Sequence, residues 1–310
     1  MKLRLGSRTS RLAVRQSQQV AQRLEDAGST VEIVEISTRG DEKRDLAFAQ
    51  IGAPGVFVRE LERALEAGVV DLVVHSYKDL PSISPDGLEV AAVPPRVDAA
   101  DCLLVLPEAI DPQRGADELL PLRVGAVVGT ASARRRALLH DLRADLQIAH
   151  LRGNVPTRIE KLRRRDYHAV VLAAAGLERL GESAEGLLVR RLDPAVFVPA
   201  PSQGALAVQV RAPSNDRDRS IRQRVAALED AATRRVIEAE RHLQALVEGG
   251  CQTAFGAWCR IRSDHSLILH AAFEGPEGLR RTTGSGDRPH DLAASLLPKL
   301  RPHLGAPSNA

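Results

Sequence analysis

Residues 56–75 read VFVRELERALEAGVVDLVVH, and this stretch decides the fold class. Phe57, Leu61 and Leu65 recur at the spacing of one face of an amphipathic helix, and Gly68 is placed to end it. Asp71–His75 (DLVVH) then forms a short apolar run typical of a buried strand. A helix followed at once by a buried strand is the unit of α/β domains with largely parallel sheets.

The same alternation extends along the chain in both directions. A helix that Ser10 caps and Gly28 stops is predicted near the N-terminus. Further strands are predicted at Val31–Ile36, Leu103–Leu106, Val124–Val128, Ile148–Leu151 and Ala169–Ala173. Most of the chain is therefore expected to be α/β.

Two proline clusters, Val93–Pro95 and Val198–Pro201, mark the expected crossovers between domains. They divide the chain into a first domain of residues 1–95 and 200–222 and a second of residues 96–199. Residues 223–310 form a third, small α+β domain, in which a long helix at about Leu228–Glu248 precedes alternating strands and a final helix. The expected architecture is two α/β domains and a small C-terminal α+β domain.

Composition excludes several classes of protein. The chain has 310 residues, of which 44% are hydrophobic and 27% charged, as in ordinary globular proteins. No apolar run approaches the roughly 20 residues that span a bilayer, so no membrane association is expected. The N-terminal segment lacks the apolar core of a secretory signal, and the three cysteines cannot pair completely, so we expect a reducing, cytoplasmic compartment. The nine histidines show no zinc-binding spacing, so no metal is expected.

The charge is distributed unevenly, which indicates an anionic partner. The formal net charge is +3, yet residues 123–165 contain eleven basic and three acidic residues. Because aromatic residues make up 3% of the chain, stacking platforms for single-stranded nucleic acid are scarce. A small polyanion is therefore favoured over RNA or DNA.

Four polar turns follow predicted strands, where open α/β sheets bind ligands. They are Gly6–Ser10 (GSRTS), His75–Pro81 (HSYKDLP), Gly129–Arg135 (GTASARR) and Arg152–Arg158 (RGNVPTR). Each has a plain structural alternative, such as an ion pair of Lys78 with Asp79, or helix capping by Ser132 with the following arginines on a solvated face. Three arginine-bearing turns together nevertheless predict carboxylate binding, because guanidinium groups bind carboxylates bidentately.

Cys251 lies in EGGCQTAFG, a polar and glycine-rich stretch after the long predicted helix. A lone cysteine is usually a small buried hydrophobic residue. Its flexible neighbours weaken that interpretation, while the end of a helix would not activate the thiol. A covalent attachment point fits this position better than a fast nucleophile.

Taken in order, the motifs resemble the porphobilinogen deaminase family, also called hydroxymethylbilane synthases. They are SRTSRLA, STRGD, GVFVRELERAL, VHSYKDLP, VGTASARRR, LRGNVPTR, AAAGLERLG, PSQGALAVQ and EGGCQ, running from about Leu3 to the last helix. The resemblance implies three domains, the first two like a periplasmic binding protein. It also implies a dipyrromethane cofactor on a thioether to Cys251, onto which four porphobilinogen molecules are added with loss of ammonia.

The resemblance also implies roles for individual residues. Asp79 matches the catalytic aspartate, which stabilises the cationic azafulvene left when ammonia departs. The cofactor-binding positions are Cys251, Lys78, Ser10, Thr130, Ser132, Arg134 and Arg135. The substrate-binding positions are Arg8, Arg152, Arg158, Gln203 and Phe57. The family is usually monomeric, and its product passes to the next enzyme of tetrapyrrole synthesis.

The chain departs from the family pattern before the second helix. FAQIGAPGVF carries Gln50 and Pro54 where the family commonly has lysines, and Tyr77 replaces a methionine in the aspartate motif. One alternative is therefore a weakened homologue that binds polycarboxylate pyrroles without polymerising them efficiently. A periplasmic-type binding protein is a second alternative, and a nucleic-acid binder explains the basic segment but neither Asp79 nor Cys251.

Overall fold

The computed structural model describes residues 1–36, 56–115, 118–247 and 254–301. Its chain forms two compact units. Unit 1 comprises Met1–Val97 and Gly204–Arg234, and unit 2 comprises Asp98–Gln203 and Arg235–Ala310. The small C-terminal sheet belongs to unit 2 in this division, and the finer division into three domains stays a prediction.

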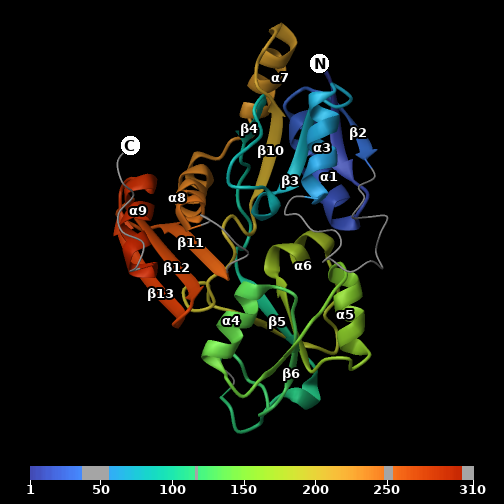
Figure 1. Cartoon of the computed structure of the whole chain (residues 1–310). Coiled ribbons are helices and arrows are strands. Elements are labelled where there is room, and N and C mark those ends of the chain that lie inside the picture. The colour runs from blue at the N-terminus through green and yellow to red at the C-terminus, as the bar shows by residue number, and fades with distance from the viewer. Residues whose placement is uncertain (37–55, 116–117, 248–253, 302–310) are drawn as a thin grey trace. The chain divides into compact units, whose positions relative to one another are not determined.

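Unit 1 is built on a five-stranded sheet of order β2-β1-β3-β10-β4 (Figure 1). Its elements are β1 (Lys2–Arg8), α1 (Arg11–Asp26), β2 (Thr30–Ile36), α3 (Val56–Glu66), β3 (Leu72–Ser76), the 3₁₀ turn η1 (Tyr77–Asp79), β4 (Leu88–Ala92), β10 (Leu206–Arg211) and α7 (Asp216–Ala226). Strands β1, β2 and β3 are parallel, whereas β10 is antiparallel to both β3 and β4. The ends of β1 and β3 therefore share an edge with the start of β10.

The sequence of strand β3 is almost continuously apolar because the strand is buried on both faces. Leu72 and Val74 belong to the buried core that contains Val20 and Leu24 of α1. Val73 belongs to a second core, with Leu61 and Leu65 of α3. Because both faces of the sheet are covered, successive side chains are all buried. The helix and strand predicted from residues 56–75 are confirmed.

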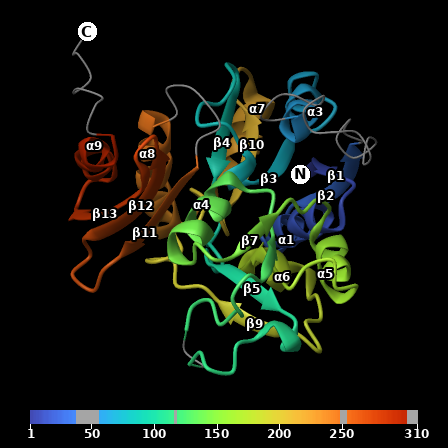
Figure 2. The same cartoon turned by 60° about the horizontal axis from the view of Figure 1, so that its bottom comes forward.

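Unit 2 holds a second five-stranded sheet, of order β7-β6-β8-β5-β9 (Figure 2). Its elements are β5 (Asp101–Val105), the 3₁₀ turn η2 (Pro107–Ala109), β6 (Val127–Gly129), α4 (Ala133–Leu142), β7 (Gln147–Ala149), α5 (Val155–Arg163), β8 (Ala169–Ala173), α6 (Ala174–Leu180) and β9 (Leu188–Arg191). Strands β6, β7 and β8 are parallel, and β5 runs antiparallel to β8. The first residue of β5 consequently lies where β8 ends.

The remainder of unit 2 is a three-stranded antiparallel sheet with helices, coloured orange to red in Figures 1 and 2. It comprises α8 (Ala231–Val247), which crosses the boundary between the units, β11 (Phe255–Ile261), β12 (Leu267–Gly275), β13 (Gly278–Gly286) and α9 (Pro289–Leu300). The predicted fold class, two α/β sheets and a small C-terminal α+β part, is confirmed. Two predicted strands are shorter than expected. Strand β6 begins at Val127 rather than Val124, because Gly125 has φ +72° and Val124 is exposed. Strand β7 ends at Ala149 rather than Leu151.

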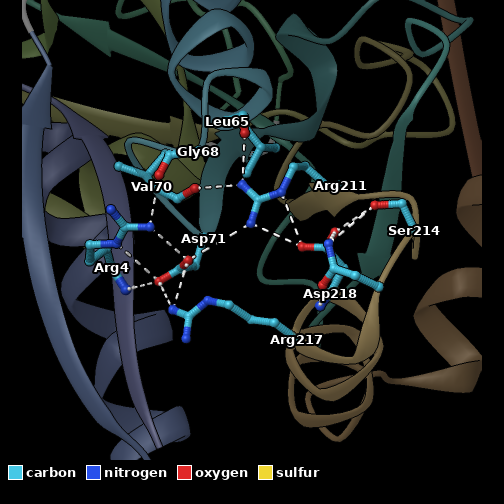
Figure 3. Close-up of polar contacts among 10 residues, drawn as sticks. Arg4, Leu65, Gly68, Val70, Asp71, Arg211, Ser214, Arg217 and Asp218 are labelled. Atoms are coloured by element: carbon cyan, nitrogen blue, oxygen red, sulfur yellow. Dashed lines mark hydrogen bonds and ion pairs between the residues drawn. The ribbon is translucent and has the colours of Figure 1, made fainter.

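Unit 1 contains a cluster of arginines around the buried Asp71, at the edge where β3 begins (Figure 3). The Asp71 carboxylate accepts hydrogen bonds from Arg4 at 3.0 and 3.3 Å and from Arg217 at 3.1 Å. Arg211 lies 3.8 Å from Asp71, and it donates to Asp218 at 3.0 Å. Burial alone would raise the pKa of Asp71, but the hydrogen bonds from Arg4 and Arg217 outweigh it and lower that pKa. This Asp71 cluster joins β1, β3, β10 and α7.

Candidate active site

The turn that carries Lys78 and Asp79 follows β3 and is held at its base. The amide of Tyr77 donates to the carbonyl of Ala205 at 3.1 Å, and Gln16 Nε2 donates to Ser76 Oγ at 2.8 Å. Tyr77 is buried, Lys78 is half-buried and Asp79 is exposed. The backbone of η1 is thus fixed, while the Asp79 carboxylate stays accessible to a ligand.

A buried polar chain, which sequence reasoning missed, lies behind this turn. Nε2 of His75 lies 3.0 Å from Oε1 of Gln209, whose Nε2 donates to Oε1 of Glu62 at 3.2 Å. Because the Gln209 amide nitrogen donates to Glu62, its oxygen accepts from His75, which places a proton on His75 Nε2. Burial lowers the pKa of His75 to about 4, so its ring is neutral at pH 7. The position of His75 in HSYKDLP was visible in the sequence, but its partner Gln209 is 134 residues away.

Arg8 and Ser10 lie at the same edge of unit 1 as Asp79. Arg8 ends β1, which is parallel to β3, and its charge contributes to lowering the pKa of His75 after the larger effect of burial. Ser10 is the N-cap of α1, where its Oγ accepts from the amide of Ala13 at 3.4 Å. The structure therefore brings Arg8, Ser10, Lys78 and Asp79 to one sheet edge.

Two predicted site residues have no described side chain. Phe57 lies in the first turn of α3, and nothing beyond its place on that helix is described. Cys251 lies outside the described residues, as do Gln50 and Pro54. In sequence, Cys251 falls between the end of α8 at Val247 and the start of β11 at Phe255.

In unit 2 the turn after β6 opens α4. Thr130 is buried, and its Oγ1 accepts from the amide of Ser132 at 3.2 Å. Ser132 is the N-cap of α4 and accepts from the amide of Arg135 at 3.4 Å. The capping interpretation of Ser132 is thus confirmed. That interpretation also placed the following arginines on a solvated face. This part is wrong for Arg134 and Arg135, which are only 7% and 6% exposed.

These two arginines are buried because a carboxylate, Asp101, lies between them. Asp101 is 0% exposed and opens β5. Arg135 donates to Oδ1 through Nη2 at 2.7 Å and Nε at 3.2 Å, and Arg134 Nη1 donates to Oδ2 at 2.9 Å. Burial would raise the pKa of Asp101, but the two guanidinium charges hold it well below its usual range. We name Arg134, Arg135 and Asp101 the Asp101 cluster.

Sequence reasoning missed Asp101 because its partners are 33 and 34 residues away. The available signal was an acidic residue directly before the apolar run CLLVL, where a fully buried strand begins. Buried charges in proteins are paired, so such a residue implies a cationic partner. The sequence did not reveal that β5 is antiparallel, which is why Asp101 reaches the edge where β6 and β8 end.

Gln203 binds the same carboxylate. Its Nε2 donates to the carbonyl of Ala99 at 2.8 Å and to Asp101 Oδ1 at 3.0 Å, and the residue is buried. The neighbouring Ser202 has φ +62°, a conformation that costs energy for a residue with a side chain. Its amide donates to Glu240 Oε2 at 2.6 Å, which helps to hold the turn. Gln203 thus anchors this turn to β5; a direct role toward substrate stays a prediction.

Arg152 and Arg158 flank the start of α5. Arg152 is exposed in the loop after β7, and Arg158 is half-buried on the helix, where its Nε donates to the carbonyl of Gly153 at 2.7 Å. Burial, and then the charge of Arg135, lower the pKa of Arg158 to about 10. Arg158 therefore lies within electrostatic reach of the Asp101 cluster and remains cationic at pH 7.

The strand that follows the Cys251 segment packs against Arg134. The amide of Ala257 donates to the carbonyl of Pro199 at 3.0 Å. A Cβ at Gly256 would lie 2.7 Å from the Val198 carbonyl oxygen and 3.1 Å from Arg134 Cδ, so a side chain at this position would clash. Within unit 2, Gly256, which follows Cys251 closely in sequence, therefore lies beside Arg134.

The donor chemistry of this cluster fits a polycarboxylate. A guanidinium has five N–H donors. Among the described residues, Arg134 donates through Nη1, to Asp101 and to the Val198 carbonyl, which leaves the hydrogens of Nε and Nη2 for another acceptor. Two guanidinium groups share one carboxylate, and the charge of Arg158 acts on Arg135 nearby, so the surplus is positive. Acetate and propionate groups of a pyrrole are acceptors of the matching kind.

Within the described residues, no three His, Cys, Asp or Glu side chains are grouped so that they could hold a metal ion. None of the helices described is both long enough and apolar enough to cross a membrane.

Known proteins match this chain over nearly its full length. The family model described as "Porphobilinogen deaminase, dipyromethane cofactor binding domain" matches residues 3–219. A porphobilinogen deaminase of Geobacillus sp. (strain WCH70) is 38% identical over 303 residues, which cover 96% of this chain and 93% of that protein. One of Acidothermus cellulolyticus is 42% identical, covering 96% of this chain and 88% of that protein. One of Roseiflexus sp. (strain RS-1) is 41% identical, with 96% and 94% covered.

Proposed function

The chain belongs to the porphobilinogen deaminase family, and on that premise we propose how its residues carry out the family's reaction. The enzyme is a transferase of tetrapyrrole and heme biosynthesis. It joins four porphobilinogen molecules head to tail, with loss of one ammonia at each addition, and water then releases hydroxymethylbilane. The observation that carries this conclusion is the match to deaminases along 96% of the chain, together with the cofactor-domain model.

The dipyrromethane cofactor, when bound, supplies the pyrrole carbon to which the first substrate unit is joined. In the proposal Cys251 holds it through a thioether, and Thr130, Ser132, Arg134 and Arg135 bind its acidic side chains. The position of β11 beside Arg134 supports this, because the strand follows Cys251 closely in sequence. Lys78 and Ser10 are the cofactor-binding residues that unit 1 would contribute.

Asp79 is the proposed catalytic residue. As ammonia leaves porphobilinogen, positive charge spreads to the pyrrole N–H, and a carboxylate beside that nitrogen stabilises it. The exposed Asp79 carboxylate on a well-anchored turn suits this role. Arg8, Arg152, Arg158, Gln203 and Phe57 are proposed to bind the substrate and the growing chain.

We further propose that the protein acts as a monomer in the cytoplasm, with neither nucleic acid nor membrane as a partner. Its product would pass to the next enzyme of the tetrapyrrole pathway. The three-domain division at residues 95/96, 199/200 and 222/223 belongs to the same proposal. The alternative of a weakened homologue is not favoured, because the matched relatives are named as deaminases.

Denaturing mass spectrometry of the intact protein tests the proposed function. Protein from a host that makes porphobilinogen should be heavier than its sequence by two pyrrole units, and substrate should add species with one, two and three further units. Cys251→Ser should abolish the added mass. The matched control is Cys102→Ser, since burial raises the pKa of the Cys102 thiol to about 11 and makes it a poor nucleophile. An unmodified wild-type chain would contradict the proposal.

A further inference from the structure

Asp101 holds the two arginines of the Asp101 cluster through different nitrogen atoms. Arg135 meets Oδ1 of Asp101 through both Nε and Nη2, and its Nη1 donates to the Val171 carbonyl at 2.8 Å. These bonds on both sides fix the plane of the Arg135 guanidinium. Arg134 is held through Nη1 at 2.9 Å from Asp101 and 2.8 Å from the Val198 carbonyl. Both guanidinium groups thus have one orientation each, with Asp101 common to the two.

Asp101 also sets the charge of the cluster. Arg134 and Arg135 both donate to Asp101, so their two positive charges lie close together and would repel each other if the carboxylate were absent. One negative charge permits their burial and leaves a positive surplus, to which Arg158 adds. A second acid would cancel the attraction for an anionic ligand. Cluster geometry and charge therefore depend on the same residue.

The cluster is itself tied to β5 and to the turn before β10. Gln203 Nε2 donates to Asp101 Oδ1 at 3.0 Å, which gives that oxygen a third donor. The carboxylate is consequently held from three directions and cannot follow a guanidinium that moves. Such a group orients its partners rather than adapting to them.

We propose that Asp101 is a positioning residue, whose carboxylate holds Arg134 and Arg135 in the orientation in which they donate to the acidic side chains of the dipyrromethane cofactor. This inference rests on the proposed function, since it takes the arginine pair to face that cofactor. Its consequence is specific: Asp101 governs how readily the chain acquires its cofactor, in addition to any effect on stability. A purely structural counter-ion would affect stability alone.

The Asp71 cluster provides the matched control. Asp71 is also buried and bound by arginines, but it lies at the edge where β3 begins, and no predicted site residue lies there. Asp101→Asn and Asp71→Asn each replace a buried carboxylate by an amide of the same shape. Asp101→Glu keeps the charge and moves the carboxylate by one methylene.

Cofactor loading is the decisive measurement. Each variant is purified without cofactor from a host unable to make porphobilinogen, its folding is checked by circular dichroism, and it is titrated with porphobilinogen. Intact mass then reports the fraction of chains that carry two pyrrole units. We expect Asp101→Asn to require about ten- to a hundred-fold more porphobilinogen for half loading, the effect of one lost charge-assisted hydrogen bond. Asp71→Asn should load as the wild type does.

Wild-type loading of folded Asp101→Asn would overturn the proposal. If that variant does not fold, Asp101→Glu decides: impaired loading by the folded protein supports a positioning role, and wild-type loading overturns it. Failure of the proposed function is distinguishable, because the wild-type chain would then acquire no two-ring mass at any porphobilinogen concentration.

Discussion

The Asp71 and Asp101 clusters have the same chemistry and opposite positions. Each centres on a buried aspartate whose pKa is lowered by arginines that outweigh the effect of burial. Asp71 precedes β3, at the edge of unit 1 where the parallel strands begin (Figure 3). Asp101 opens the antiparallel β5, at the edge of unit 2 where β8 ends. Ligands of open α/β sheets bind beyond the carboxyl ends of strands, so only the position of Asp101 is suited to a site.

The comparison teaches that arginines around a carboxylate do not by themselves mark a ligand site. In the Asp71 cluster, a second acid, Asp218, binds Arg211, whose Nη1 also donates to the carbonyls of Leu65 and Val70. The acids and carbonyls there satisfy the arginines and join the elements of unit 1. In the Asp101 cluster, Arg134 donates to other described residues through Nη1, which leaves the hydrogens of Nε and Nη2 for a ligand. Four sets of measurements test this distinction between residues that stabilise the fold and residues that serve the site, in order of decreasing expected effect.

Asp79→Asn should have the largest effect, and on activity alone. Loss of the charge that stabilises the developing cation should lower kcat by roughly 10²- to 10³-fold, the range for removing one stabilising group. Because Asp79 is exposed, its thermal unfolding midpoint should stay near that of the wild type. Ammonia release and thermal unfolding measure the two quantities. A variant with wild-type turnover would remove Asp79 from the mechanism.

Asp71→Asn should show the reverse pattern. Breaking a buried ion pair costs about 3–5 kcal/mol, and we expect the lower end because Arg4 and Arg217 are partly exposed. Urea unfolding measures this loss, while kcat per folded molecule should be unchanged. A fall in kcat at full folding would mean that the Asp71 cluster also serves the site, contrary to the distinction drawn between the two edges.

His75 should make stability depend on pH between 7 and 5. Its pKa is about 4 in the folded protein and about 6.5 in an unfolded chain, so the unfolded state takes up the proton first as pH falls. By linkage, the free energy of unfolding should drop by about 2 kcal/mol over that range. Asp71, with a lowered pKa, stabilises the fold above about pH 4 and loses this contribution at lower pH, so it adds little slope here. Urea titrations of wild type and His75→Gln at several pH values should differ by that slope.

Ser132→Ala and Ser10→Ala should have the smallest effects. Both residues cap helices, and loss of a cap costs about 1 kcal/mol of unfolding free energy. Ser132→Gly separates capping from binding, because glycine at an N-cap costs only a few tenths of a kcal/mol. If the Ser132 hydroxyl also binds the cofactor, this variant will need more porphobilinogen for half loading at nearly unchanged stability. Equal loading would assign Ser132 to capping alone.

Much of the fold could be predicted from periodicity. The sequence predicted a helix through Leu61 and Leu65 and a strand through Leu72–Val74, because each pattern is local and repeats at the period of its element. Ser10 and Ser132 were recognisable as caps for the same reason. The start of β6 was misplaced, since the positive φ of Gly125 redirects the chain within an apolar run.

The sequence by itself determined which residue types follow each strand: the arginines, the Lys78–Asp79 pair and the cysteine whose surroundings indicate a tether. Tertiary structure decided which of these charges are buried and what neutralises them. Asp101 meets Arg134 across 33 residues, and His75 meets Gln209 across 134. Such pairs depend on strand order and direction, and no local period encodes either. The antiparallel course of β5 is the physical reason that a carboxylate from the start of one strand comes to hold arginines at the end of others.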